Sequence, residues 1–105
     1  MNDYKKELLS KIKEQVQSIE SDSEVFLFGS QARGEERKDS DWDILILTPN
    51  KADLKDEQIF RHKLFYLELE YGVAFSTFVY SKYDWNHKYS VTPFYNNIIK
   101  EGIKI

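Results

Sequence analysis

The chain has 105 residues, of which 15 are basic, 18 are acidic and none is cysteine. This length is typical of one domain, and the lack of cysteine excludes disulfide bonds, thiolate metal sites and a cysteine nucleophile. The net charge of −3 disfavours direct binding to nucleic acids, and the mean hydropathy of −0.61, without a long apolar run, disfavours a membrane helix or a signal peptide. We therefore expect residues 1–105 to form a single soluble domain in the cytoplasm.

The first two predicted elements are a helix over residues 2–20 and a strand over 24–28. In the helix, apolar residues recur at intervals of three and four, and Asn2 or Asp3 is a suitable N-terminal cap. The strand is short and rich in aromatic and β-branched residues, which is typical of a strand that is buried on both faces.

The rest of the chain continues this alternation. We predict a strand over 41–48, a helix over 52–70, a strand over 73–80, a short helix or turn over 81–88, and a partly apolar tail. Gly72 marks the end of the helix over 52–70. Its apolar stripe contains Leu54, Ile59, Phe60, Leu64, Leu67 and Tyr71. The order of elements indicates a small α/β (α+β) fold with a mixed β-sheet and helices packed on it.

Gly29 and Ser30 directly follow the first strand. Glycine lets the backbone approach a ligand closely, and a serine at the start of a helix offers a hydroxyl and free N–H groups to an anion such as phosphate. This dipeptide alone is weak support for such a site, because Gly-Ser after a strand is most often only a turn.

Asp41 and Asp43 stand at the beginning of the second strand. Side chains two positions apart on a strand point to the same face, so the two carboxylates repel each other unless a cation joins them. Mg²⁺ is suited to this role, since it takes one or two carboxylates and completes its shell with water and phosphate oxygens. The alternative is that Asp41 begins the strand in solvent while Asp43 caps a turn. The apolar run of residues 44–47 weakens that alternative, and the two features together indicate a nucleotide site.

Two segments carry a family resemblance. Residues 28–34 contain Gly-Ser followed by Arg-Gly, and residues 40–46 contain Ser-Asp-x-Asp leading into an apolar strand. This pattern resembles the signature of the DNA polymerase β-like nucleotidyltransferase superfamily. It is most similar to the minimal nucleotidyltransferase (MNT, MntA-like antitoxin) group, whose members are often paired with HEPN-type proteins in toxin–antitoxin modules.

The resemblance implies a magnesium-dependent transfer of a nucleoside monophosphate from a nucleoside triphosphate, in the first place ATP, to an acceptor hydroxyl. By this analogy Asp41 and Asp43 are both the catalytic residues and the metal ligands, and Gly29 with Ser30 holds the β and γ phosphates. Arg33 would neutralise phosphate, although a solvated arginine beside acidic neighbours is an equal alternative. Ser40 belongs to the nucleotide-binding segment, where its hydroxyl is expected to fix the loop rather than to touch the substrate.

The sequence departs from the family at one position. Active members carry a third carboxylate on the next strand, where it serves as general base. In this chain Ser76 or Thr77 stands there, and neither residue accepts a proton near neutral pH. The nearest acids in sequence, among them Glu68 and Asp84, would have to reach in from other elements. Reduced or lost activity, in a nucleotide-binding module that holds a HEPN-type partner, is therefore the alternative function.

Two further expectations concern the position of Trp42 and the assembly of the protein. Trp42 lies between the two aspartates and must point to the opposite face of its strand, so we expect it in the core rather than stacked on a base. A small sheet with an exposed edge, together with seven tyrosines, is compatible with a homodimer.

Overall fold

The computed structural model describes residues 1–105 and contains one four-stranded sheet with the strand order β3-β2-β1-β4. The strands are β1 (Glu24–Phe28), β2 (Trp42–Thr48), β3 (Phe75–Ser81) and the short β4 (Ile103–Lys104). β1 pairs antiparallel with both β2 and β4, whereas β2 and β3 are parallel. The carboxyl end of β1 therefore meets the amino ends of β2 and β3 at one end of the sheet.

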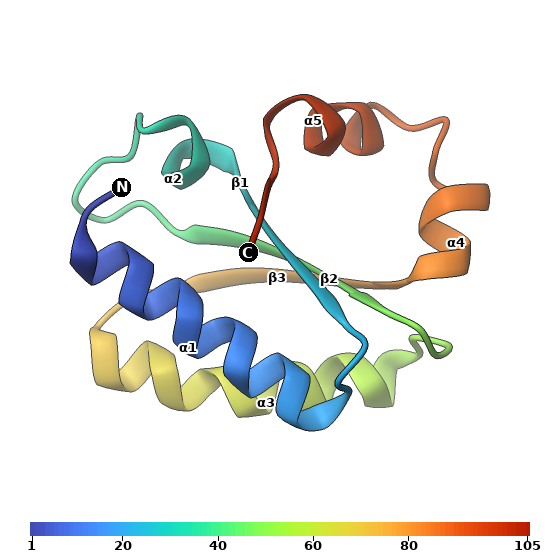
Figure 1. Ribbon diagram of the computed structural model, residues 1–105, viewed down its shortest axis with the longest axis horizontal. Helices are drawn as coiled ribbons and strands as arrows, with labels where there is room; N and C mark the ends of the chain where they lie inside the picture. Colours follow the sequence, from blue (N-terminus) through green and yellow to red (C-terminus); the bar gives the residue numbers. More distant parts are fainter.

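Five helices cover the sheet. They are α1 (Asp3–Ile19), α2 (Gly29–Arg33), α3 (Leu54–Tyr71), α4 (Lys82–His87) and α5 (Pro93–Glu101). Figure 1 shows α1 and α3 side by side along one face of the sheet, while α4 and α5 lie across the other face. No helix combines the length and the apolar character that crossing a membrane requires. The expected mixed sheet with packed helices is confirmed.

The alternation of side chains along the strands creates a core on each face of the sheet. The larger core joins the sheet to α1 and α3, and its fully buried members include Leu8, Leu27 and Ile44. The smaller core joins the sheet to α4 and α5 through Leu45 and Trp85 among others. Because β2 contributes to both cores, its apolar run cannot shift in register without exposing one of them.

The ends of the long helices follow the signals in the sequence. The Asn2 side chain caps α1 by accepting a hydrogen bond of 2.8 Å from the Lys5 N–H. α3 begins with a capping box between Asp53 and Asp56, and it ends where Gly72 adopts a left-handed conformation at φ 64°. The predicted cap of the first helix and the predicted end of the second long helix are thus confirmed.

The buried face of α3 and the structure of the tail differ from the sequence-based expectations. Of the stripe predicted for α3, Phe60 and Leu64 are buried against α1 and the sheet, whereas Leu54 and Ile59 are 65% and 44% exposed. The tail forms α5 and β4, and its two-residue strand is too short to produce an alternating pattern in the sequence.

Side chains of α3 cover the outer edge of β3. The Phe75 N–H donates a hydrogen bond of 3.0 Å to the Glu68 carboxylate, and the Arg61 guanidinium donates one of 2.9 Å to the Thr77 carbonyl. Both are backbone groups that an edge strand otherwise leaves free for pairing. The opposite edge of the sheet is the two-residue β4.

Candidate functional site

The turn after β1 brings the backbone against a carboxylate. Gly29 has φ 73°, in the left-handed region, and it starts the short helix α2. A Cβ atom at this position would overlap the Asp43 carboxylate, and it would lie 3.0 Å from Asp43 Cγ. Glycine is therefore required twice here, for the backbone conformation and for the close approach to β2.

Asp41 and Asp43 lie together with Ser76 at the amino ends of β2 and β3. Ser76 is in register with Asp43 in the parallel pair, and its hydroxyl donates a hydrogen bond of 3.3 Å to the Asp41 carboxylate. Asp41 is exposed, whereas Asp43 and Ser76 are half-buried. The structure thus brings together the two aspartates that the sequence pattern singled out, on the face of the sheet opposite α1 and α3.

The electrostatics of this end of the sheet disfavour a negative charge on Asp43. Partial burial raises the pKa of Asp43, and the neighbouring charge of Asp41 raises it further, while Arg33 acts in the opposite direction. Both raising effects penalise an ionised carboxylate, and a bound cation would relieve them. Two carboxylates side by side fit the donor preference of Mg²⁺, which takes one or two protein carboxylates together with water or phosphate oxygens.

The loop between α2 and β2 is held by short-range hydrogen bonds. The Ser40 hydroxyl accepts a hydrogen bond of 2.8 Å from the Arg37 N–H, so it stabilises the turn that leads to Asp41. This agrees with the role expected of Ser40. The buried Gln31 side chain from α2 adds a long contact of 3.4 Å to the Ser40 carbonyl.

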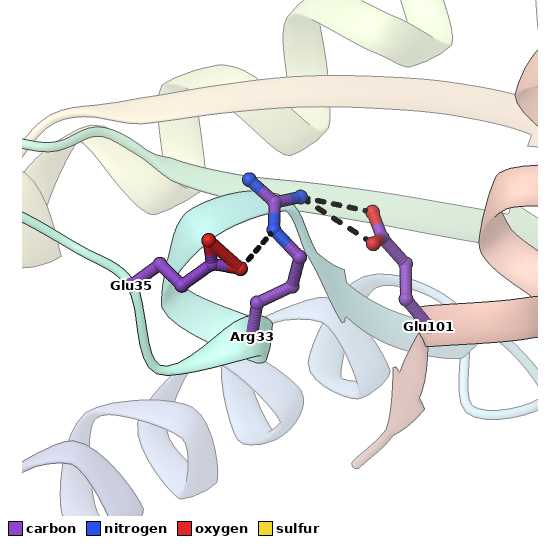
Figure 2. A network of polar contacts seen from close by, with 3 residues as sticks. All are labelled: Arg33, Glu35 and Glu101. Atoms are coloured by element: carbon purple, nitrogen blue, oxygen red, sulfur yellow. Dashed lines mark hydrogen bonds and ion pairs between the residues drawn. The ribbon is translucent and has the colours of Figure 1, made fainter.

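Arg33, at the end of α2, lies between two carboxylates. Its Nε donates to Glu35 at 3.0 Å, and its Nη1 lies 3.2 and 3.4 Å from the two carboxylate oxygens of Glu101 (Figure 2). The hydrogen bonds to Glu35 and Glu101 raise the pKa of Arg33, so the guanidinium is charged at all relevant pH values. Glu101 follows Arg33 by 68 residues, and no local pattern predicts their contact.

No third acidic, histidine or cysteine side chain joins the two aspartates in a metal-binding cluster. Of the two residues considered for the third carboxylate position, Ser76 is the one beside Asp43, whereas Thr77 is in register with Ile44. Glu68 accepts the Phe75 N–H, and the Asp84 N–H is bonded to Ser81 at the far end of β3. Neither acid reaches the aspartates from these positions.

Trp42 points away from the aspartates, as expected. Its side chain is 3% exposed and belongs to the core against α1 and α3. The largest cavity, about 590 Å³, also opens on that side, between α1 and the loops before β2 and β3, with Tyr4, Lys5 and Arg37 in its lining. Neither Asp41 nor Asp43 lines this cavity.

Comparisons with known proteins identify relatives of this chain. A family model described as "Nucleotidyltransferase domain" matches residues 9–104. The "Putative protein adenylyltransferase MJ0141" of Methanocaldococcus jannaschii is 33% identical over 78 residues, which are 72% of this chain and 79% of that protein.

Two solved structures share the fold. One is a toxin–antitoxin crystal structure with AMP-PNP, with a TM-score of 0.59 and 15% identity over 88% of this chain and 70% of the other. The second is a mutant of the toxin–antitoxin MntA–HpeT, with a TM-score of 0.64 and 14% identity over 90% of this chain and 69% of the other. At these identities the likeness shows the fold alone.

Proposed function

Because the chain belongs to the nucleotidyltransferase domain family, we propose that it transfers a nucleoside monophosphate from a nucleoside triphosphate to a hydroxyl group of an acceptor, within a single domain that spans residues 1–105. The observation that carries this proposal is the convergence of Gly29, Asp41 and Asp43 at one end of the sheet. ATP is the proposed donor, since the name of the archaeal relative specifies adenylyl transfer.

In this proposal Asp41 and Asp43 hold Mg²⁺. Their common face and the raised pKa of Asp43 support a site that is completed by a divalent cation. When bound, the ion supplies positive charge that screens the phosphate oxygens and orients them for transfer.

The residues of the chain have distinct tasks in the reaction. Gly29, without a side chain, lets the turn approach Asp43 closely, and Ser30 offers its hydroxyl and the backbone N–H groups of the turn to phosphate. Arg33 compensates phosphate charge, and Ser40 keeps the loop before Asp41 in place. The acceptor oxygen bonds to the α-phosphorus, the bond from that phosphorus to the β-phosphate oxygen breaks, and pyrophosphate leaves.

The proton of the acceptor hydroxyl has no obvious base in this chain. Ser76 occupies the position in register with Asp43, and a serine hydroxyl does not accept a proton near neutral pH. In our proposal the base is supplied from the acceptor side.

The proposed acceptor is a hydroxyl on a partner protein. The name of the archaeal relative specifies a protein adenylyltransferase, and both structural neighbours are toxin–antitoxin assemblies. A HEPN-type protein is the proposed partner, in the cytoplasm, with a homodimer as a further possible assembly. The net charge of −3 disfavours a polynucleotide as the acceptor.

Ser76, in place of an acid beside Asp43, supports a second candidate function. Without an acid beside the aspartates, the protein would bind a nucleotide and a HEPN-type partner as an antitoxin-like module and turn the nucleotide over slowly or not at all. Binding without transfer distinguishes this function from the first.

A label-transfer experiment separates the two functions. The purified protein is incubated with Mg²⁺ and each nucleoside triphosphate labelled at the α-phosphate, with and without the protein encoded next to it. Transfer by the wild type that is lost in Asp43→Asn and kept in Asp39→Asn, an exposed aspartate of the preceding loop, supports catalysis. Nucleotide binding without transfer under all conditions overturns catalysis and supports the binding module.

A further inference from the structure

We propose that the C-terminal segment completes the nucleotide site, with Glu101 as a positioning residue that holds the Arg33 guanidinium for a phosphate group. This inference rests on the proposed function of the site. It assigns a role to a residue that lies far from the sequence motif and that makes no contact with the two aspartates.

The first support is the geometry of the guanidinium. Glu35 engages Nε and Glu101 engages Nη1, so two sides of the group are fixed by carboxylates (Figure 2). The third nitrogen, Nη2, contacts neither carboxylate. A guanidinium has five N–H donors, and those of Nη2 remain for a phosphate oxygen without loss of either ion pair.

The second support is the location of Arg33 relative to the aspartates. α2 packs against both β1 and β2, the two strands that meet where Phe28 is in register with Asp43. Because α2 starts at Gly29 and ends at Arg33, the same short helix carries the turn that approaches Asp43 and the cation. A phosphate group beside Gly29 would therefore lie within the reach of Arg33.

The third support is the backbone that brings Glu101 to this place. At Gly102 the chain turns from α5 into β4, and its N–H donates a hydrogen bond of 2.8 Å to the Ile98 carbonyl. A Cβ atom on Gly102 would lie 2.6 Å from that oxygen, so only glycine fits without a shift. β4 then pairs with β1, with Ile103 opposite Leu27, and this pairing anchors Glu101 over α2.

An exposed arginine side chain is otherwise free to sample many rotamers. A side chain that is already ordered loses less conformational entropy when the ligand binds. This difference corresponds to about a threefold to tenfold change in affinity. Glu101 could in principle also compete with phosphate for the same cation. The two roles predict opposite signs for the effect of removing Glu101.

The test measures binding of MgATP by calorimetry and the order of the Arg33 side chain by ¹⁵N relaxation of its Nε–H group, in the full chain. For Glu101→Ala we expect a mobile Arg33 and a dissociation constant that rises about threefold to tenfold. Glu101→Gln keeps a hydrogen-bond acceptor and should recover part of the loss. In an Arg33→Ala background, Glu101→Ala should have no further effect.

Glu57→Ala is the matched control, because Glu57 forms an ion pair of similar exposure with Arg61 within α3, away from α2 and β4. It should change neither measurement. An Arg33 that stays ordered in Glu101→Ala, or an affinity that is unchanged or higher, overturns the positioning role while the nucleotide site stands. A wild-type protein that binds no nucleoside triphosphate overturns the proposed function and this role with it, even where Arg33 order depends on Glu101.

Discussion

The Asp43 carboxylate lies against Gly29 and occupies the space that a Cβ atom at position 29 would need. Phe28, the residue before Gly29, is the register partner of Asp43 in the antiparallel pair of β1 and β2. The position of the Gly29 turn and the position of the Asp43 carboxylate are thus coupled.

Gly29→Ala should reduce stability and weaken nucleotide binding. The substitution adds a Cβ at positive φ and forces the Asp43 carboxylate to shift, and together we expect these to cost about 2–4 kcal/mol in the free energy of unfolding. Gly34→Ala is the control, since Gly34 has φ 71° but no atom within 4 Å of the place that a Cβ would occupy. It should cost only about 1–2 kcal/mol. Denaturant unfolding compares the two, and equal losses would contradict the contact with Asp43.

Asp43→Asn should abolish transfer and yet stabilise the protein at neutral pH. The folded state raises the pKa of Asp43, so the ionised form at pH 7 reduces stability, and the neutral amide removes this effect. Because solvent screens a half-buried group, we expect only about 0.5 kcal/mol, or about 2–4 °C in the melting temperature.

The stabilisation of Asp43→Asn should also depend on pH. As the pH falls through the pKa of Asp43, the wild-type side chain binds a proton and becomes neutral, so the difference between the two proteins should disappear. Melting curves between neutral and acidic pH test this, with Asp39→Asn as the exposed control. A difference that grows toward acidic pH would contradict the assigned cause.

Ser76→Asp should increase the transfer rate, since it adds a carboxylate beside Asp43, at the position where the family resemblance implies a third acid. A general base contributes about 100-fold or more, and an engineered one should reach at least about tenfold. Ser76→Asn has the same shape without the charge and should leave the rate unchanged. Equal rates in the two variants would show that a base does not limit the reaction. Steady-state label transfer with saturating MgATP measures this.

Trp42→Phe should lower the stability of the fold and leave the affinity for nucleotide nearly unchanged. Trp42 lies between the two aspartates in sequence but packs in the core, so the smaller ring should cost about 1–2 kcal/mol in the free energy of unfolding. The affinity for MgATP should remain within about twofold of the wild type, because the indole does not face the nucleotide. A loss of affinity without a loss of stability would indicate that the ring stacks on a base.

The sequence was informative where local chemistry determines the structure. The bounds of β1 and the existence of β2 follow from two apolar runs, one ended by Gly29 and the other preceded by the paired aspartates. The contact between Arg33 and Glu101 could not be predicted in this way. It depends on the pairing of β4 with β1, and a two-residue strand has too few residues to show a period.

Helix α3 illustrates the same limit within one element. Its end was predicted because Gly72 acts on its immediate neighbours, whereas the capping box of Asp53 and Asp56 at its start was not predicted. Its buried face was not fully predictable, since Leu54 and Ile59 have the same hydrophobic character as Phe60 and Leu64, and only the crossing of α3 over α1 and the sheet decides which of them is covered.

The hydrogen bonds that Arg61 and Glu68 make with the edge of β3 affect how readily the protein aggregates in concentrated solution. A strand that approached this edge would have to displace both charged side chains from the backbone groups they satisfy. Lateral growth of the sheet into fibrillar aggregates is therefore opposed at the amino-terminal half of β3.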